Sequence, residues 1–292
     1  MRILISGVNG FVGQSLAASL REHSIIGIGR QTTSISACEY YKWDISEWSD
    51  EVVDAIGDVD IIIHAAASLS VDDDDSGLIN TNCMGTYNIY KFAKKRKPKK
   101  MFYISSAPII GNPVVHPIDE NHPLNPQLMY HATKLAGEYI LNQLNKYGIE
   151  VVNLRINAPI GCHMPIKSIV PIFVDNALKR RNLVLNGQGS RKQTYLDVRD
   201  LSRVILENLN REGIAGTYII AGKEAVSNKK LAELCVEISR SASKILFSGI
   251  TDENDGVVWD YDCSKAENVL GFSARYSIED SLKWMISSKA LY

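Results

Sequence analysis

Two side chains able to transfer a proton lie four residues apart in this chain, Tyr130 and Lys134. In a helix, residues at this spacing lie on the same face, so the phenol and the ammonium could meet. A tyrosine can give or take a proton, and a nearby positive charge favours its phenolate form. The same spacing is common in helices that have no catalytic task. The two residues are therefore either a proton-transfer pair or ordinary neighbours on one helix face.

Three glycines near the start of the chain form the pattern GxxGxxG: Gly7, Gly10 and Gly13. They stand between a short apolar run and an amphipathic stretch, which predicts a turn from a strand into a helix. Glycines at such a turn let the backbone approach a pyrophosphate, which then rests on the helix N-terminus. The spacing differs by one residue from the GxGxxG pattern of the dehydrogenase Rossmann fold. This position in the chain favours dinucleotide binding over a structural turn.

The residues at the end of the second predicted strand bear on the choice between NAD and NADP. About twenty residues beyond the glycines, an acidic side chain would hold the ribose 2′-hydroxyl of NAD. Here Gly29 and Arg30 occupy that place, and a guanidinium can bind a 2′-phosphate through two hydrogen bonds. This favours NADP, with a solvent-facing Arg30 as the alternative. Asp44, after the third strand, could contact the adenine or cap the following helix.

Short runs rich in Ile and Val alternate with amphipathic stretches through the first half of the chain. This alternation implies a parallel, doubly wound sheet. The expected buried strands are residues 2–6, 25–29, 60–67, 100–106 and 150–156.

Tyr130 and Lys134 fall within a predicted helix that ends before Gly148, with Asn125 as its N-cap and Pro126 at its first position. After about residue 160 the pattern is less regular. We therefore expect a Rossmann-like NAD(P)-binding domain at residues 1–160 and a smaller α/β substrate-binding lobe formed mainly by residues 161–292.

Composition excludes several partners. The 292 residues carry a net charge of −1, which gives no general attraction to nucleic acid or to anionic membranes. The basic run at residues 94–100 indicates a solvated helix end, and the acidic run at 72–75 an exposed loop more than a metal site. Five scattered cysteines without a CxxC pair indicate reduced thiols, and no segment resembles a signal peptide or a membrane span. We expect a cytoplasmic protein without a metal.

Together these motifs resemble the extended short-chain dehydrogenase/reductases, a family of nucleotide-sugar epimerases, reductases and dehydratases. The resemblance covers nearly the whole chain. Each motif is modest, but their joint occurrence in this order is specific. Besides the glycines, the motifs are HAAA at 64–67, NCMGT at 82–86, ISSAPIIG at 104–111, YHATK at 130–134, LRINAPIG at 154–161, TYLDVRDL at 194–201 and DCSKAENVLGF at 262–272.

The resemblance implies an NAD(P)-dependent enzyme that acts on a secondary alcohol of a sugar, as a nucleotide-sugar epimerase or 4-ketoreductase. Tyr130 and Lys134 match the family's YxxxK signature, Ser106 its catalytic serine and Ser105 a supporting neighbour. Ser106 would hydrogen-bond the substrate oxygen while Tyr130 takes or returns its proton. Lys134 would favour the phenolate and bind the nicotinamide ribose.

Further contacts follow from the same resemblance, together with a nucleotide-sugar substrate and a homodimer. The implied cofactor-binding residues are Gly7, Asn9, Gly10, Phe11, Val12, Gly13, Arg30, Asp44, Ile45, Ala65, Ala66, Ala67, Asn82, Tyr130 and Lys134. The implied substrate-binding residues are Ser106, Ala107, Asn157, Ala158, Arg191 and Gln193.

The sequence also departs from the family. Ala107 and Pro108 stand where dehydratases carry Asp and Glu, which argues against water elimination. Ala158 replaces an Asn of the epimerases that bind nucleoside diphosphates. Gln193 replaces their phosphate-binding Arg, and Arg191 and Lys192 could compensate.

Two polar residues within these motifs have structural explanations. We expect His64 to pack beside the cofactor loop, not to act as a catalyst, and Asn82 to tie a helix to the sheet more than to relay protons. Two other functions stay open: a reductase of a non-nucleotide carbonyl compound, and a non-catalytic NADP sensor.

Overall fold

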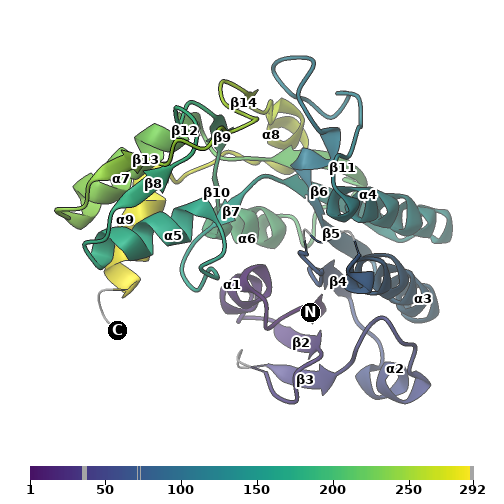
Figure 1. The fold of residues 1–292 in the computed structure, drawn as a ribbon. Helices are drawn as coiled ribbons and strands as arrows, with labels where there is room; N and C mark the ends of the chain where they lie inside the picture. The colour runs from purple at the N-terminus through teal and green to yellow at the C-terminus, as the bar shows by residue number, and fades with distance from the viewer. Residues whose placement is uncertain (35–37, 71, 73, 290–292) are drawn as a thin grey trace.

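A sheet of seven parallel strands forms the centre of the first lobe (Figure 1). The computed structural model describes residues 1–34, 38–70, 72 and 74–289. The strands run in the order β11-β6-β5-β4-β1-β2-β3. Their bounds are Arg2–Ser6 for β1, Ser24–Gly29 for β2, Glu39–Lys42 for β3, Ile61–His64 for β4, Lys100–Ser106 for β5, Glu150–Ile156 for β6 and Gly216–Ile220 for β11. The predicted doubly wound parallel sheet is confirmed.

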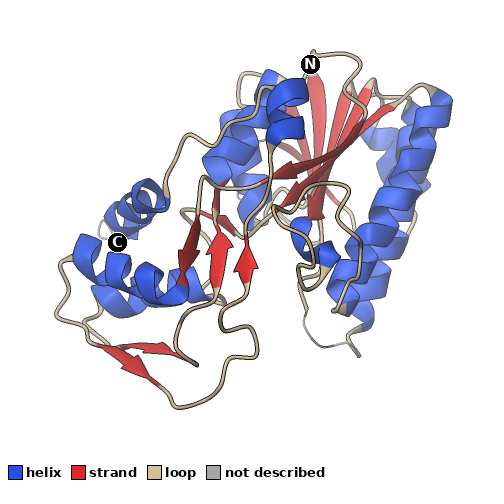
Figure 2. Cartoon of the chain, turned by 90° about the horizontal axis from the view of Figure 1, so that it is seen from above, coloured by secondary structure: helices blue, strands red, loops and turns tan. Residues whose placement is uncertain are grey.

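Helices cover both faces of this sheet (Figure 2). One face carries α1 (Phe11–Ser19), α6 (Val198–Glu207) and α8 (Ser264–Leu270), and the other carries α2 (Asp50–Ile56), α3 (Thr86–Arg96) and α4 (Met129–Asn142).

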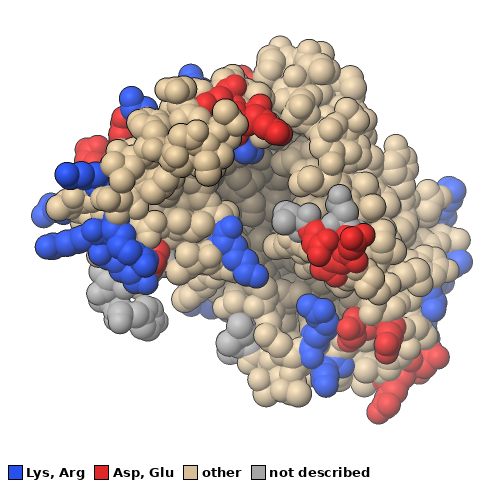
Figure 3. Space-filling model, in the orientation of Figure 1, with Lys and Arg blue, Asp and Glu red and all other residues tan. Residues whose placement is uncertain are grey.

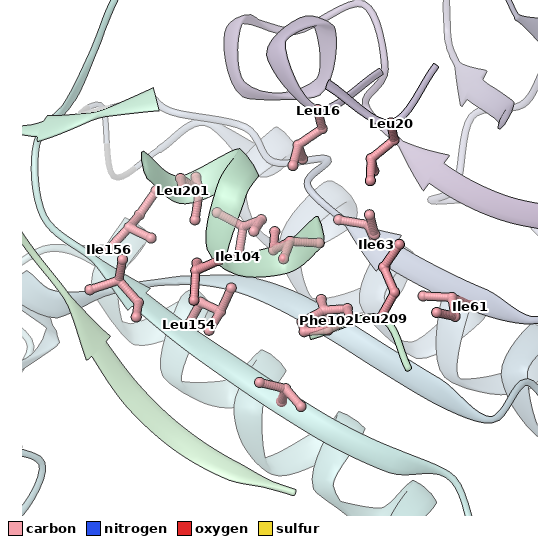
Figure 4. Close-up of a cluster of buried hydrophobic side chains, with 14 of the residues drawn as sticks. Leu16, Leu20, Ile61, Ile63, Phe102, Ile104, Leu154, Ile156, Leu201 and Leu209 are labelled. Carbon is pink, nitrogen blue, oxygen red and sulfur yellow. The ribbon is translucent and has the colours of Figure 1, made fainter. Parts of the chain in front are cut away.

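The strand residues alternate between these two layers, as a pleated strand requires. Ile61 and Ile63 of β4 join the cluster under α1, where Leu16 and Leu20 meet the sheet (Figure 4). Ile62, between them, packs on the opposite face. Because both faces of each strand are buried, the strands read as continuous apolar runs in the sequence.

The order of strands reverses between β1 and β4. From β1 the chain moves outward to β2 and β3, then returns to β4 and continues through β5 and β6 on the other side. The helices that follow β1 and β4, α1 and α3, lie on opposite faces of the sheet. This divergence leaves room for a ligand beyond the carboxyl ends of the strands.

The second lobe has its own core, formed by α5 (Ile169–Leu178), α7 (Asn228–Ser239), α9 (Ile278–Lys289) and short strands. The short strands outside the central sheet are β7 (Pro159–Ile160), β8 (Leu183–Leu185), β9 (Lys192–Thr194), β10 (Leu196–Asp197), β12 (Ala225–Ser227), β13 (Ile245–Phe247) and β14 (Val258–Trp259). Of these, β7, β8, β12 and β13 contribute residues to this core. Three elements from beyond residue 160, β11, α6 and α8, pack in the first lobe. The division of the chain into two domains at residue 160 stays a prediction.

Helix α4 begins later than predicted. Its N-cap is Leu128, which offers no side-chain cap, so the prediction of Asn125 as N-cap and Pro126 at the first position is wrong. The backbone N–H of Asn125 instead donates to the carbonyl of Ile109 at 3.1 Å, because this segment runs beside the 3₁₀ turn that follows β5. At the other end the helix continues as a 3₁₀ turn to Gly148, whose φ of 75° is left-handed, as predicted.

The charged run at residues 94–100 divides between a helix end and a strand. Lys94, Lys95 and Arg96 form the last turn of α3, which confirms the predicted helix end. Lys100 is buried in β5, where its ammonium donates to the backbone carbonyl of Asn208 at 2.9 Å. None of the described helices has the length and apolar character that crossing a bilayer requires.

Close backbone approach explains the glycine pattern. Gly7 has a φ of +72°, and a β-carbon there would lie 2.7 Å from the Cα of Ala66 in the loop after β4. A β-carbon on Gly13 would overlap the carbonyl oxygen of Gly7 and lie 2.7 Å from the Cα of Val8. Helix α1 can therefore lie against the end of β1 only while these positions lack side chains.

Gly13→Ala should destabilise the protein by about 1–3 kcal/mol, because the added methyl group meets backbone atoms that cannot rotate away. Urea unfolding of the two proteins measures the difference. Gly148→Asn is the control, since a β-carbon there meets nothing within 4 Å and Asn tolerates the left-handed region. If Gly13→Ala were as stable as the wild type, the close approach of α1 to β1 would not constrain the fold.

Candidate active site

A cavity of about 670 Å³ lies at the ends of the central strands, between the two lobes. The space-filling view shows the hollow on this face of the molecule (Figure 3). The cavity is lined by the glycine loop, the ends of β4, β5 and β6, helix α4 and the segment before α5. It brings together the three predicted catalytic residues, Ser106, Tyr130 and Lys134.

A second cavity of about 250 Å³ lies on the other side of the glycine loop. The two cavities share Gly7, Gly10, Ala66 and Ala67 as lining residues. Between them lies the N-terminus of α1, which has no side-chain cap and no acidic residue in its first turn. The backbone N–H groups there are left for an anion. This arrangement fits a dinucleotide, with the pyrophosphate at the helix and one half of the molecule in each cavity.

Most of the predicted cofactor-binding residues line these two cavities. The larger is lined by Gly7, Gly10, Phe11, Val12, Gly13, Ala65, Ala66, Ala67, Tyr130 and Lys134. The smaller adds Asn9, Arg30, Asp44 and Ile45. Among the predicted cofactor residues, Asn82 lines neither.

Arg30 and Asp44 both lie at the smaller cavity and are exposed. Arg30 forms no ion pair with any residue in the described part of the chain. Asp44 accepts hydrogen bonds from the backbone N–H and the hydroxyl of Ser46, at 3.0 and 2.8 Å. Helix α2 is capped by Ser49, so Asp44 shapes the turn before that helix and does not cap the helix itself.

Tyr130 stands at the first turn of α4 with its ring in the larger cavity. Burial raises the pKa of its phenol to about 12. We expected Lys134 to favour the phenolate, but in the protein chain alone it is burial that sets the direction of the pKa shift. Tyr130 is therefore a neutral hydroxyl group in this state.

Lys134 is buried, with 2% of its surface exposed. Its ammonium lies 4.4 Å from the centroid of the Tyr103 ring. Burial lowers the pKa of Lys134 to about 7, against the opposing effect of the Glu138 carboxylate. Near neutral pH the side chain is thus divided between ammonium and amine.

Ser106 is the last residue of β5 and lies close to helix α4 at the cavity wall. Its neighbour Ser105 donates a hydrogen bond of 2.5 Å to Glu138. Both serines line the larger cavity, and Ser105 also anchors the strand to the helix.

His64 lies outside both cavities and is completely buried. Its Nδ1 is 2.6 Å from the hydroxyl of Ser6, and its Nε2 is 2.9 Å from that of Thr86. The ring stacks on Tyr103, and burial lowers the pKa of His64 to about 3. These contacts support the packing role expected for it.

Asn82 lies in a π-helical segment, Leu78–Gly85, before α3. Its side chain accepts from the backbone N–H of Ser68 at 2.8 Å and donates to the hydroxyl of Thr133 at 3.0 Å. Thr133 belongs to α4, so Asn82 joins the loop after β4 to the helix that carries Tyr130 and Lys134. These contacts support the structural role predicted for Asn82, which is to hold neighbouring elements together.

The predicted substrate residues divide into two groups. Asn157, Ala158 and Gln193 line the larger cavity. Arg191 and Ala107 do not. The Arg191 guanidinium stacks on Trp259 at 4.8 Å, with its Nε buried and without a hydrogen-bond partner. Arg191 therefore lies outside the larger cavity, and its role in place of the arginine that Gln193 replaces stays a prediction.

Several lining residues were missed by sequence reasoning. His131 follows Tyr130 directly in the YHATK motif, and that position was an available signal. Met164 and Lys167 come from the segment before α5, and Ile169 is the first residue of that helix; no motif marks them. Only the packing of the second lobe against the first brings this segment to the cavity.

Acidic side chains are absent from the described lining of the larger cavity, where no Asp or Glu occurs. Within the residues that can be placed, no cluster of His, Cys, Asp and Glu could hold a metal ion. Of the acidic run at 72–75, Asp73 lies outside the described residues, while Asp72 and Asp74 are exposed. None of the five cysteines, all of which lie within the described residues, forms a disulfide bond there.

The amino-acid sequence of the chain is similar to those of known proteins. Residues 3–221 match the sequence profile of the "NAD dependent epimerase/dehydratase family". The chain is 30% identical to the UDP-glucose 4-epimerase of Mycolicibacterium smegmatis, over 69% of this chain and 71% of that protein. It is 26% identical to the dTDP-glucose 4,6-dehydratase of Streptomyces niveus, over 97% of this chain and 90% of that protein.

A solved structure shares the fold over the full length. The UDP-glucose 4-epimerase from Thermotoga maritima, determined with UDP-glucose, matches with a TM-score of 0.91 over 100% of both chains, at 22% identity. The Rossmann-like architecture of the chain is thereby confirmed.

Lys134→Met should stabilise the ligand-free protein at pH 6 by a few kcal/mol, because methionine buries no charge. Burial lowers the pKa of Lys134 from 10.5 to about 7, so between these values the unfolded chain holds a proton that the folded chain has lost. The free energy of unfolding of the wild type therefore rises with pH in this range, because the folded protein no longer buries the ammonium. The advantage of the variant should shrink from pH 7 to pH 10 in urea unfolding. A variant less stable than the wild type at pH 6 would contradict this.

Proposed function

Since the chain belongs to the NAD dependent epimerase/dehydratase family, we propose that it is a nucleotide-sugar 4-epimerase, which oxidises and then reduces the C4 alcohol of its substrate. The family consists of enzymes of the short-chain dehydrogenase/reductase type, and this chain is one of them. One observation carries the proposal. Ser106, Tyr130 and Lys134 line the same cavity as the dinucleotide-type glycine loop.

Each of the three residues has a task in this chemistry. NAD(P), when bound, accepts and returns the hydride and brings a positive charge in its oxidised form. Ser106 would donate a hydrogen bond to the substrate oxygen and hold it beside the phenol. Tyr130 would take the proton of the sugar hydroxyl and return it. Lys134, in its ammonium form, would favour the phenolate that exists between these two steps.

Water elimination fits this cavity poorly, although several relatives, that of Streptomyces niveus among them, are named as dehydratases. An elimination needs an acid and a base in addition to the group that handles the alcohol proton. The described lining holds no carboxylate. Ala107 is buried and Pro108 reaches the cavity, where the dehydratase branch carries its acid and base. The lining therefore favours epimerisation over dehydration.

A 4-ketoreductase is the second candidate, favoured by Arg30 at the smaller cavity. A reductase releases its oxidised cofactor in every cycle and commonly uses NADPH, whereas an epimerase regenerates NAD internally. A reductase of a non-nucleotide carbonyl compound would also suit Ala158 and Gln193. A sensor without activity would need the glycine loop alone, so the complete Ser106, Tyr130 and Lys134 set speaks against it.

The proposed substrate is a UDP- or dTDP-hexose, the class named for the relatives. Asn157 and Gln193 would provide polar contacts on the side of the cavity away from the glycine loop. We also propose a homodimer. Helices α3 and α4 lie together on one face of the sheet and leave Tyr87 and Tyr139 exposed at 45% and 64%, so a second copy could cover these rings.

The wild-type enzyme should interconvert the 4-isomers of a UDP- or dTDP-hexose without added cofactor. Tyr130→Phe should lower this turnover by roughly 10²–10⁴-fold, because the ring still packs but the proton carrier is gone. Cofactor affinity, measured by titration, should change little. A panel of UDP-, dTDP-, GDP- and CDP-hexoses and their 4-keto-6-deoxy forms provides the substrates.

The same panel separates the two candidates. Stoichiometric oxidation of NADPH by a keto sugar, with no isomerisation, would show a reductase in place of an epimerase. A Tyr130→Phe variant that retained wild-type turnover on the accepted substrate would overturn the proposed mechanism for both.

Arg30 should give a preference for NADP over NAD, since one charge-assisted contact to the 2′-phosphate contributes about 1.5–3 kcal/mol. Titration of both nucleotides into the wild type and into Arg30→Ala measures it. The variant should lose affinity for NADP and keep its affinity for NAD. Equal affinities in the wild type, or an equal loss of both in the variant, would make Arg30 a surface residue.

A further inference from the structure

The carboxylate of Glu138 joins three elements directly beneath the cavity. Ser105 of β5 donates to its Oε1 at 2.5 Å. Arg155 of β6 donates from Nε to Oε1 at 3.0 Å and from Nη2 to Oε2 at 2.9 Å. The exposed fractions are 1% for Ser105, 3% for Glu138 and 6% for Arg155. This is a bidentate ion pair, shielded from water and completed by a hydroxyl group.

Each member of this cluster is adjacent to a residue of the proposed site. Ser105 precedes Ser106, and Glu138 lies one helical turn beyond Lys134. Arg155 comes two residues before Asn157, which lines the cavity. In the sheet, Ser105 and Arg155 face each other directly in the register of β5 and β6. A movement at the carboxylate would thus be transmitted to all three walls.

We propose that Glu138 is a positioning residue: its carboxylate fixes β5, α4 and β6 relative to one another and so sets the distance between Ser106 and Lys134. The inference rests on the proposed function, because it assigns Glu138 a task in that reaction. Glu138 itself does not line the cavity and acts through its neighbours.

Stability alone gives little reason for an ion pair at this place. Burying two charges removes them from water, and apolar side chains of similar size often hold a protein together equally well or better. Hydrogen bonds, unlike apolar contacts, fix direction and distance. A catalytic set needs its groups held within about 0.5 Å of the productive geometry, and the cluster lies where that requirement applies.

The charge of Glu138 also bears on Lys134, as the groups around the lysine show. By element, the titratable or charged groups nearby are His64 of β4, Cys83 of the π-helical segment, Tyr103 of β5, Arg155 of β6, and Tyr130 and Glu138 of α4. Burial lowers the pKa of His64 and raises the pKa of Cys83, Tyr103 and Tyr130, so these groups are neutral near pH 7. Glu138 is left as the group that supports the ammonium.

The test compares Glu138→Gln with the double variant Glu138→Leu/Arg155→Met. The single variant leaves a buried guanidinium unpaired and should unfold more easily, whereas the double variant removes both charges and should regain wild-type stability. In both, kcat on the accepted nucleotide sugar should fall about 10–100-fold, with KM and cofactor affinity changed less than about threefold. A residue that served stability alone would let kcat recover in the double variant, and that result would overturn the proposal.

One further readout and a matched control complete the experiment. Without the carboxylate, the Lys134 ammonium should be lost at lower pH, so the decline of kcat/KM at high pH should move down by about one unit in both variants. An unmoved profile would also overturn the proposal. Glu150→Gln is the matched control, because Glu150 pairs with Lys100 across the same two strands at their opposite end; it should keep the wild-type rate and profile.

Failure of this inference can be told from failure of the proposed function. If Tyr130→Phe removes turnover while the double variant works at the wild-type rate, the function stands and Glu138 is only structural. If Tyr130→Phe is as active as the wild type, the proposed reaction itself is wrong.

Discussion

A lysine ammonium buried between helix α4 and strand β5 is the constraint on which the rest of the site depends. A charge in this position is opposed by desolvation, which lowers the pKa of Lys134 to about 7. The surroundings limit that penalty without cancelling it. The Tyr103 ring lies under the ammonium at 4.4 Å, and Glu138 adds a negative charge one turn away. His64, neutral because burial lowers its pKa to about 3, adds no repulsion.

The fold places this lysine where the strand order reverses. The loop after β1 must pass close to the loop after β4, and only glycine fits at Gly7 and Gly13. The same reversal opens the space that α4 closes from the other side. A cofactor-type loop, a proton carrier and a buried cation thus meet in one cavity because of chain topology, and the second lobe adds the remaining wall.

Motif residues were predictable from the sequence because their positions follow from local structure. The glycines, Ser106, Tyr130 and Lys134 each occupy a strand end or a helix turn, and the parallel sheet brings those places together. Properties that depend on distant contacts were not predictable. The predicted start of α4 was wrong because the backbone of Asn125 pairs with that of Ile109 and does not cap the helix. The stacking of Arg191 on Trp259, which lies far away in the sequence, was not predictable either.

The protonation state of Tyr130 shows the same limit, since its pKa is raised by burial that no motif encodes.

The central claim is that the hydrogen on the reacting C4 carbon travels as a hydride within the enzyme, while Tyr130 handles only the oxygen-bound proton. The most direct measurement is to run the reaction in heavy water with unlabelled sugar and cofactor, and to locate deuterium in the product by NMR. This account predicts no deuterium on C4. Deuterium at C4 would show that this hydrogen comes from solvent, and would contradict the account.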